Sequence, residues 1–404
     1  MMRTILIAAS VLAIGALSAG AVRADQNQVQ YQASLGGIYD SNRELRSDYS
    51  EELSGSIARA DLMLQNSSPT TQLGVKLRVA DEYMPDNRDL ESDRATVALN
   101  GNTRSEHGQL YGQVQLLMDT TLATDVQAST PVTEVKDRTR ITTDVGYDYD
   151  VSELDQINLS GSAESVDYRD SELSNLSEYD FYGGSVGYSR TVSARLGLDF
   201  ALFGNRLNNP DAGYDNDTMG VKVGATFKLS ETLDVNVSLG RRKTQYEITR
   251  YLMLQIPGLP IAVPYRNHIE DSDYGRVSSA ALRYQGETSR FEFKGAYDLL
   301  PNGTGDLVER RSAAIYWQQI WSPLWVTTLN SDYWQQRSNL AFNQSDDLNS
   351  LQLALITSYR ISEDVSLFAR LQRLDRKLVE SGETAHTNQA VLEIAWVTDP
   401  LFFH

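Results

Sequence analysis

Apolar and polar residues alternate one by one along most of the chain after residue 25. From Met219 to Leu229, Met, Val, Ala, Phe and Leu occupy every second position, and Gly, Lys and Thr lie between them. The same alternation runs through Leu73–Val79, Ile141–Tyr149 and Leu233–Leu239. A period of two places one set of side chains on each face of a β-strand. The segments run about ten to thirteen residues, which is longer than the roughly 5–6 residues of an ordinary strand and is the length that a tilted membrane strand requires.

The connections between these segments are of two kinds that alternate along the chain. Eight are short and nine are long, acidic and rich in Asn and Gly, which predicts 18 strands with both ends on the side of the short turns. The short ones lie at Asn66–Pro69, Thr103–Gly108, Val151–Asp155, Arg190–Ser193, Ser230–Thr232, Gly286–Thr288, Ile320–Pro323 and Ser362–Asp364. The long ones lie at Asp40–Ser50, Tyr83–Glu91, Thr120–Arg138, Arg169–Ser177, Arg206–Asn216, Tyr246–Asp271, Pro301–Leu307, Ser338–Leu348 and Val379–His386. We expect the short turns in the periplasm and the long loops outside the cell.

Aromatic residues gather at the strand ends and predict two girdles at the membrane interfaces. One set lies near the short turns: Tyr147, Tyr149, Tyr188, Tyr284, Trp317, Trp321, Trp325, Tyr359 and Trp396. A second set lies near the long loops: Tyr39, Tyr83, Tyr168, Tyr179, Tyr246, Tyr274, Tyr297 and Tyr333. A general preference of aromatics for strands would not place them at the ends.

The ends and the composition agree with an exported barrel. Residues 1–24 have the form of a secretory signal, with Arg3, an apolar stretch and Val22-Arg23-Ala24 before an expected cleavage site at Asp25. We therefore expect a signal peptide over 1–24 and one domain over 25–404. The chain has no Cys. Its net charge of −18 makes nucleic acid an unsuitable partner, because binding to phosphate needs basic residues. After residue 24 no apolar run approaches the ~20 residues of a membrane helix.

The predicted fold is all-β: a single transmembrane antiparallel β-barrel of about 18 strands in the bacterial outer membrane. The partners expected from this fold are outer-membrane lipids, including lipopolysaccharide, and the barrel assembly machinery. The last strand, Gln389–Val397, carries Leu392, Ile394 and Trp396 on one face, and Phe402 and Phe403 follow. This aromatic ending resembles the signal by which such barrels are assembled.

No arrangement of residues indicates an enzyme. The four His lie far apart in turns, loops and the terminus, no Ser-His-Asp set falls at one rim, and no His pair has ligand spacing. We therefore expect neither a catalytic site nor a metal or other cofactor. The acidic residues Asp86, Asp89, Glu91 and Asp93 could bind divalent cations shared with lipopolysaccharide, or could form a hydrated rim.

Polar positions of the alternating pattern identify candidate lumen-lining residues: Lys76, Arg78, Tyr111, Tyr182, Arg195, Lys222, Arg283, Lys294, Tyr316 and Arg370. Acidic residues fall on the same predicted face, and the two signs nearly cancel. A uniformly basic lumen would have indicated a polyanionic solute. The inward aromatics could stack against sugar rings or could fill space.

The longest connection, Tyr246–Asp271, differs from the other loops because it is apolar. Its apolar surface is costly to expose, at about 25 cal/mol per Å², and its three prolines oppose a regular strand. We expect it either to fold into the barrel mouth as a lid or to dock on a partner. The candidate constriction residues are Leu252, Leu254, Ile256, Leu259, Ile261 and Val263.

Three short motifs resemble beta-barrel porin families. The first is Gly-Ile-Tyr-Asp-Ser-Asn at Gly37–Asn42, and the others are the turns Leu229–Glu231 and Ile361–Glu363. The resemblance implies an outer-membrane exit of an exopolysaccharide or biofilm-matrix export system, with a polysaccharide as substrate and a periplasmic polysaccharide-export protein as partner. The alternative is a passive porin for small hydrophilic solutes or oligosaccharides.

Overall fold

The computed structural model describes residues 26–403, apart from 49, 122–135, 170–175, 211–212, 256–261, 303–304, 339–346, 380 and 399–400. The signal peptide expected over residues 1–24 therefore lies outside the described residues. Among the described residues, no helix is long and apolar enough to span a membrane.

Nearly all of the described chain is strand, and one 3-10 turn, η1 (Arg88–Leu90), interrupts the series. In chain order the strands are β1 (Gln26–Asp40), β2 (Leu53–Ser67), β3 (Thr71–Tyr83), β4 (Ser92–Ser105), β5 (Gly108–Thr120), β6 (Asp137–Asp150), β7 (Asp155–Tyr168), β8 (Tyr179–Ser193), β9 (Leu196–Asn209), β10 (Tyr214–Lys228), β11 (Leu233–Gln255), β12 (Ala262–Gln285), β13 (Ser289–Pro301), β14 (Leu307–Ser322), β15 (Trp325–Ser338), β16 (Leu348–Arg360), β17 (Val365–Leu378), β18 (Thr384–Val397) and β19 (Leu401–Phe403).

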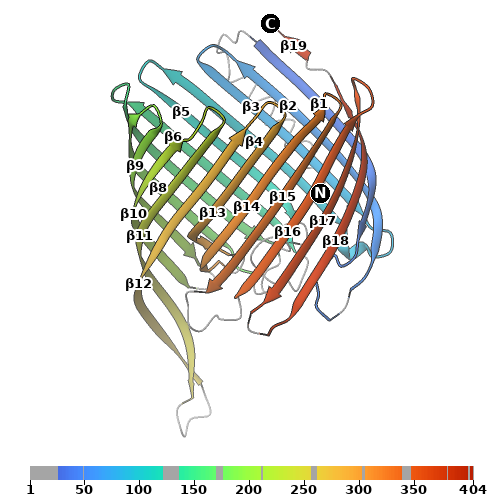
Figure 1. Ribbon diagram of the computed structural model, residues 1–404. Helices are drawn as coiled ribbons and strands as arrows, with labels where there is room; N and C mark the ends of the chain where they lie inside the picture. The colour runs from blue at the N-terminus through green and yellow to red at the C-terminus, as the bar shows by residue number, and fades with distance from the viewer. Residues whose placement is uncertain are drawn as a thin grey trace.

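Each strand pairs antiparallel with the next, and the sheet closes on itself as a barrel (Figure 1). The closing seam joins β1 to β18, from Gln32 opposite Val397 to Asp40 opposite Gln389. The short β19 continues the same edge of β1, because Leu401–Phe403 pairs with Asn27–Val29. The barrel therefore has 18 strands, and the predicted all-β antiparallel architecture is confirmed.

The two ends of the barrel differ as the pattern predicted. Short turns gather at one end, together with the start of β1 and with β19, and the long connections gather at the other end (Figure 1). We call these the short-turn end and the long-loop end. Strand ends differ from the prediction by a few residues in places: β8 continues to Ser193, three residues past Arg190.

β11 and β12 differ most from the prediction, because the expected loop Tyr246–Asp271 is largely strand. The two strands pair with each other up to Gln255 opposite Ala262, and they project beyond the rim as a two-stranded hairpin (Figure 1). Pro264 lies within β12, opposite Met253. β12 pairs with β13 only from Ser278 onward, so at Pro264 it is an edge strand, and edge strands are where proline is tolerated in a sheet.

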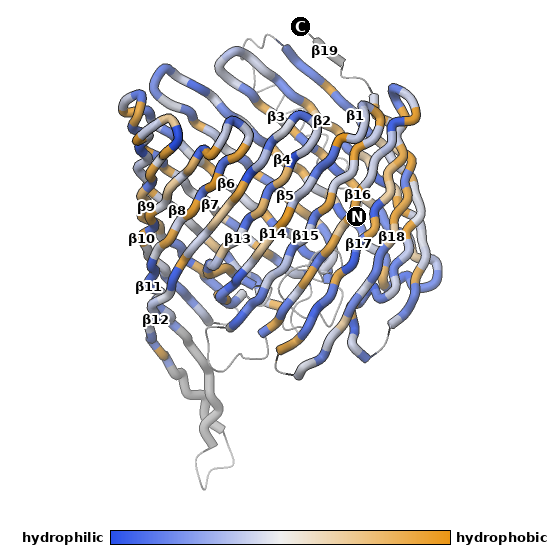
Figure 2. The backbone as a smooth tube through the Cα atoms, in the orientation of Figure 1, coloured by the Kyte–Doolittle hydropathy of each residue, from blue (hydrophilic) through white to orange (hydrophobic). Residues whose placement is uncertain are grey.

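Alternation along each strand separates an outward face from an inward face. Directly opposed residues share a face, so the pairings carry this division around the whole barrel. Large apolar residues cover the outward face, for example Leu35, Val145, Val186 and Leu202, which are all about half exposed. Figure 2 shows the resulting alternation of hydrophobic and hydrophilic positions along the strands.

The aromatic girdle at the short-turn end faces outward. Tyr147 stacks on Tyr149, and Trp321 lies with its ring centroid 6.4 Å from Trp317 and 6.0 Å from Trp325. The second predicted girdle is only partly present. Tyr39, Tyr83, Tyr274, Tyr297 and Tyr333 share the outward face, whereas Tyr168, Tyr179 and Tyr246 face inward and are buried.

Candidate channel lumen

The inward face contains eight of the ten candidate lumen-lining residues. The pairings place them on β3, β5, β10, β12, β13, β14 and β17: Lys76, Arg78, Tyr111, Lys222, Arg283, Lys294, Tyr316 and Arg370. Their assignment to the inward face follows from strand register alone. Their role in transport stays a prediction.

The other two candidates lie elsewhere. Tyr182 is on the outward face of β8, in phase with Val186 and Tyr188 and opposite Ala163. Phe181 and Tyr182 are adjacent aromatics, so the sequence does not decide which of the two faces the lumen. Pairing of β8 with β7 and β9 turns Phe181 inward. Arg195 lies in the short turn between β8 and β9, because β8 continues further than the pattern indicated.

Basic side chains are concentrated on one side of the lumen, on β2, β3, β4 and β17. Arg59 forms an ion pair with Glu393 of β18, and Arg78 lies 2.6 Å from Asp61. Lys76 and Arg370 extend the same wall, and Arg94 adds a further guanidinium. We call this set (Arg59, Lys76, Arg78, Arg94 and Arg370) the basic arc.

Acidic side chains are concentrated on the other side, on β6, β7, β9 and β11. This set, which we call the acidic arc, consists of Asp144, Asp148, Glu164, Asp199 and Asp234. Positive charges also lie on this side: Lys222 and Lys228 of β10 face inward, with Lys228 opposite Asp234. Arg140 lies 2.7 Å from Glu164 and Arg138 lies 3.0 Å from Asp119. The charges of the lumen nearly cancel in sum. The basic arc and the acidic arc lie on different sides, and each side also carries charges of the other sign, such as Glu393 beside Arg59 and Lys228 opposite Asp234.

Two inward aromatics lie flat on the lumen wall. Tyr111 of β5 lies over Gly146 of β6, where an added Cβ would come within 2.2 Å of the ring. Phe203 of β9 lies over Gly220 of β10 in the same way, at 2.3 Å, and the ammonium of Lys222 lies 4.8 Å from its ring centroid. Tyr111 is 41% exposed, so one face of its ring is open to the lumen. The glycines permit this geometry because they leave room for a ring on the wall.

The β1–β2 loop folds inward at the long-loop end, where Asp40 and Asn42 hold it. Oδ1 of Asp40 accepts hydrogen bonds from the Asn42 N–H (3.0 Å) and the Thr387 hydroxyl (2.5 Å). The Asn42 amide donates to the carbonyls of Arg46 (2.9 Å) and His386 (3.1 Å). These two residues end the Gly37–Asn42 motif, so the motif fastens this loop to β18.

The underside of the β1–β2 loop is apolar. Leu45, at a φ of 52°, is buried together with Met84 and Leu90 of the β3–β4 connection. They pack against inward residues of β1, β2, β17 and β18, namely Ile38, Leu53, Ile57, Leu374, Ala385 and Val391. Arg43 joins the two connections, since it donates to the Leu90 carbonyl (2.7 Å) and to Glu82 (2.6 Å).

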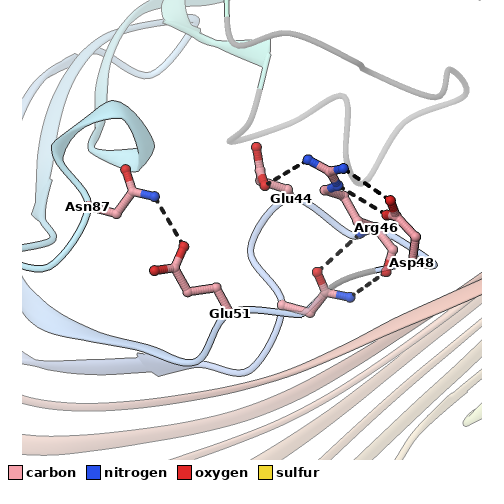
Figure 3. Close-up of polar contacts among 6 residues, drawn as sticks. Glu44, Arg46, Asp48, Glu51 and Asn87 are labelled. Atoms are coloured by element: carbon pink, nitrogen blue, oxygen red, sulfur yellow. Dashed lines mark hydrogen bonds and ion pairs between the residues drawn. The ribbon is translucent and has the colours of Figure 1, made fainter.

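The upper side of the same loop is charged. Arg46 lies between Asp48, at 3.2 Å, and Glu44, at 4.0 Å, and Asn87 donates to Glu51 at 3.1 Å (Figure 3). Arg46 and Asp48 are 51% and 69% exposed in their side chains. The two connections thus form one unit, apolar toward the wall and charged toward the mouth, over β1–β4 and β17–β18.

The tip of the β13–β14 hairpin also lies inside the barrel mouth. Leu299 and Leu307 are 3% and 2% exposed, and they pack against inward residues of β7–β11 and a neighbouring loop residue, namely Val166, Tyr168, Leu176, Tyr179, Leu207, Tyr214 and Tyr246. Because the strand pairing of β12 with β13 ends at Ser278 opposite Tyr297, the last residues of β13 are free to leave the wall.

Polar contacts attach this tip to the same wall. Glu309 of β14 lies 2.6 Å from Arg242 of β11, whose side chain is 1% exposed. The Asn209 amide donates to the Gly305 carbonyl at 3.2 Å, and Asp298 lies 3.8 Å from Lys222. Each contact joins residues whose strands are at least three positions apart in the barrel. Pairing between neighbouring strands could not bring such residues together. The tip therefore narrows the mouth on the side of the acidic arc.

The hairpin of β11 and β12 contains the predicted constriction residues, but Figure 1 shows its paired part running outward from the rim. Leu252 and Leu254 lie on β11 and Val263 lies on β12. Ile256, Leu259 and Ile261 lie outside the described residues. Described segments that enter the mouth include the β1–β2 and β3–β4 connections and the β13–β14 tip. The sequence pattern gave no signal for the β13–β14 tip.

No protein-family model matches this chain, and no curated protein matches it. Solved structures do match over most of its length. The ferric-catecholate import receptor Fiu from E. coli K12, in its open form, is 9% identical with a TM-score of 0.48, covering 93% of this chain and 82% of that chain. Pseudomonas aeruginosa OpdL is 14% identical with a TM-score of 0.42, covering 92% and 98%. Pseudomonas aeruginosa OccK2, in complex with glucuronate, is 10% identical with a TM-score of 0.44, covering 94% and 98%. Likeness at this level carries no inference about function.

The barrel itself defines the class of protein. A closed antiparallel sheet satisfies its backbone hydrogen bonds between strands, so it has no open edge to expose to lipid. Its apolar outward face, with aromatics at both ends, is the surface that a bilayer requires. The chain is an outer-membrane β-barrel protein, located in the bacterial outer membrane.

Proposed function

We propose that this protein is an outer-membrane channel that passes small hydrophilic solutes, and that its selectivity is set by opposed charges inside a narrowed mouth. The observation that supports the proposal most is the placement of the basic arc and the acidic arc on different sides of the lumen. Charges of opposite sign on facing walls orient water and dipolar solutes between them. An apolar solute would have to displace this oriented water, so such a lumen favours hydrophilic solutes.

The inward-folded segments support a limit on solute size. A barrel of 16–18 strands is wide enough for an aqueous channel unless loops fold into it. Here one unit, formed by the β1–β2 and β3–β4 connections, covers the side of the basic arc. The β13–β14 tip covers the side of the acidic arc. We propose that solutes pass between these two, and that the size limit of the channel is set there.

Liposome swelling tests this function directly. Purified protein in liposomes should admit neutral monosaccharides and disaccharides at rates that fall steeply with size, and planar bilayers should show single-channel conductance. A barrel that folds, but admits no sugar and carries no ion current, would overturn the proposal.

A second function, export of a polysaccharide, is favoured by the aromatic rings on the wall. Tyr111 over Gly146 presents an open ring face, which is the surface on which a sugar ring stacks. Such a system would include a periplasmic polysaccharide-export protein as partner. In a clean deletion strain the extracellular matrix should then be lost while the synthesis machinery remains. Normal matrix in that strain would leave the diffusion channel as the better account.

A further inference from the structure

An outward-facing cluster of basic residues lies near the long-loop end of β11, β12 and β14. We call it the outer basic patch, and it consists of Arg241, Lys243, Arg276 and Arg311. Arg241 lies directly opposite Arg276 in the pairing of β11 with β12. Cross-strand partners have their Cβ atoms about 5 Å apart, and two like charges at that distance destabilise the sheet.

No acidic group neutralises this patch among the described residues. Most inward arginines form ion pairs, whereas the patch residues contact aromatic rings: Lys243 lies 5.9 Å from the Tyr274 ring centroid and Arg311 lies 5.3 Å from that of Tyr297. The nearest acids are already paired or further out. Glu309, two residues from Arg311, pairs with Arg242 at 2.6 Å and accepts a hydrogen bond from the Tyr297 hydroxyl. Asp217 faces Arg206 at 3.9 Å, and Glu247 and Glu270 lie opposite each other toward the hairpin tip.

The patch lies at the border between the apolar band and the outside. On β11 the outward residues Leu233, Val235, Val237 and Leu239 are followed by Arg241. Eight residues separate Leu233 from Arg241, a height of about 20 Å for strands tilted by about 40°, within an apolar band about 25 Å tall. β12 and β14 run in the opposite direction, so Arg276 precedes Ala280 and Leu282, and Arg311 precedes Ala313 and Ile315; both therefore also lie on the long-loop side of the apolar outward positions. This is the level at which lipid headgroups of the outer leaflet lie.

A groove leads from the patch into the apolar band. Its volume is about 820 Å³, and the small outward residues Ser278, Ala280 and Gly295 line it. Leu198, Val223 and Leu239 border it, and Tyr297 and Arg311 line it as well. An acyl chain can lie in a groove of this kind with its phosphate at the arginines.

We infer that this surface binds a phosphorylated glycolipid of the outer leaflet, the diphosphorylated lipid A part of lipopolysaccharide. Its phosphates accept hydrogen bonds from Arg241, Arg276 and Arg311, since guanidinium groups bind phosphate in a bidentate manner. One acyl chain occupies the groove over Gly295. The negative charge of the lipid also offsets the repulsion between Arg241 and Arg276. Other outward arginines of this rim, such as Arg206 and Arg373, lie beside a carboxylate, so the patch fixes where this lipid contacts the barrel.

Native mass spectrometry of the purified full chain in detergent tests the inference with three probes: diphosphoryl lipid A, monophosphoryl lipid A and phosphatidylglycerol. The unmodified protein should retain diphosphoryl lipid A best. The double variant Arg241→Gln with Arg276→Gln should bind it at least tenfold more weakly. Gly295→Leu should also weaken binding, by filling the groove without changing charge. A Cβ at Gly295 makes only ordinary contacts, at 3.7 Å and beyond, so this variant should fold.

Arg190→Gln is the matched control, because Arg190 is an outward, exposed arginine of β8 at the opposite, short-turn end, 3.5 Å from Asp155. It should leave binding unchanged. Equal retention of lipid A by the unmodified protein and the double variant would overturn the inference. So would equal loss in the Arg190 control, or retention of phosphatidylglycerol as strong as that of lipid A. None of these measurements depends on transport.

Discussion

The β13–β14 tip offers the sharpest test of the proposed channel. Leu299 and Leu307 are almost fully buried against the inner wall of β7–β11. Replacing a buried Leu by Ala costs about 2–5 kcal/mol. The barrel wall does not depend on this contact, so the loss falls on docking of the tip. Even about 2 kcal/mol changes the docked-to-undocked ratio by about 30-fold, since every 1.4 kcal/mol is a factor of ten.

Single-channel recording in planar bilayers measures the consequence. The double variant Leu299→Ala with Leu307→Ala should show a larger mean conductance and more frequent transitions, and liposomes should admit larger sugars. The control is Leu371→Ala with Leu392→Ala, two outward leucines that are 58% and 55% exposed, whose conductance should equal that of the unmodified protein. Unchanged conductance in a double variant that still migrates as a folded barrel would refute the reasoning.

The β11–β12 hairpin provides a second comparison for the same assay. The sequence predicted either a lid or a docking surface within Leu252–Val263, and the paired part of this hairpin runs outward, away from the mouth. Deleting residues 252–263 should therefore leave conductance unchanged. An increase in conductance after this deletion, with none after undocking of the β13–β14 tip, would return the constriction to the hairpin.

Three other predictions address topology, selectivity and stability. An epitope inserted at residues 210–213, between β9 and β10, should be labelled on intact cells, whereas one at Ser230–Thr232 should not; labelling of the second would reverse the orientation of the barrel. Lys76→Glu on the basic arc should shift ion permeability toward cations in reversal-potential measurements, and an unchanged reversal potential would show that the arc does not face the permeation path. Arg138→Gln should destabilise the barrel by about 3–5 kcal/mol, because it removes the guanidinium that lies 3.0 Å from Asp119, whose side chain is 0% exposed; an unaltered unfolding midpoint in urea would contradict that figure.

Local pattern accounts for what the sequence predicted well. Strand positions, the number of strands and the inward or outward direction of most side chains follow from a period of two, which is a property of each segment by itself. Errors arose where the pattern was locally ambiguous. Adjacent Phe181 and Tyr182 both suit either face, and only pairing with β7 and β9 decides that Tyr182 faces outward. Arg195 was misplaced because turn residues do not mark the end of β8 sharply.

The tertiary structure alone decided what lies inside the mouth. The Asn209–Gly305 contact joins residues 96 positions apart, and no local pattern encodes such a pairing. Tyr179 and Tyr246 have the composition of girdle residues, but they are buried beneath the β13–β14 tip. Likewise, the charges of the lumen nearly cancel along the chain, and only closure of the barrel brings β2–β4 and β17 together as a basic side. The sequence by itself determined which faces are polar; the folded barrel determined which polar residues face one another, because closure unites strands that are distant in the chain.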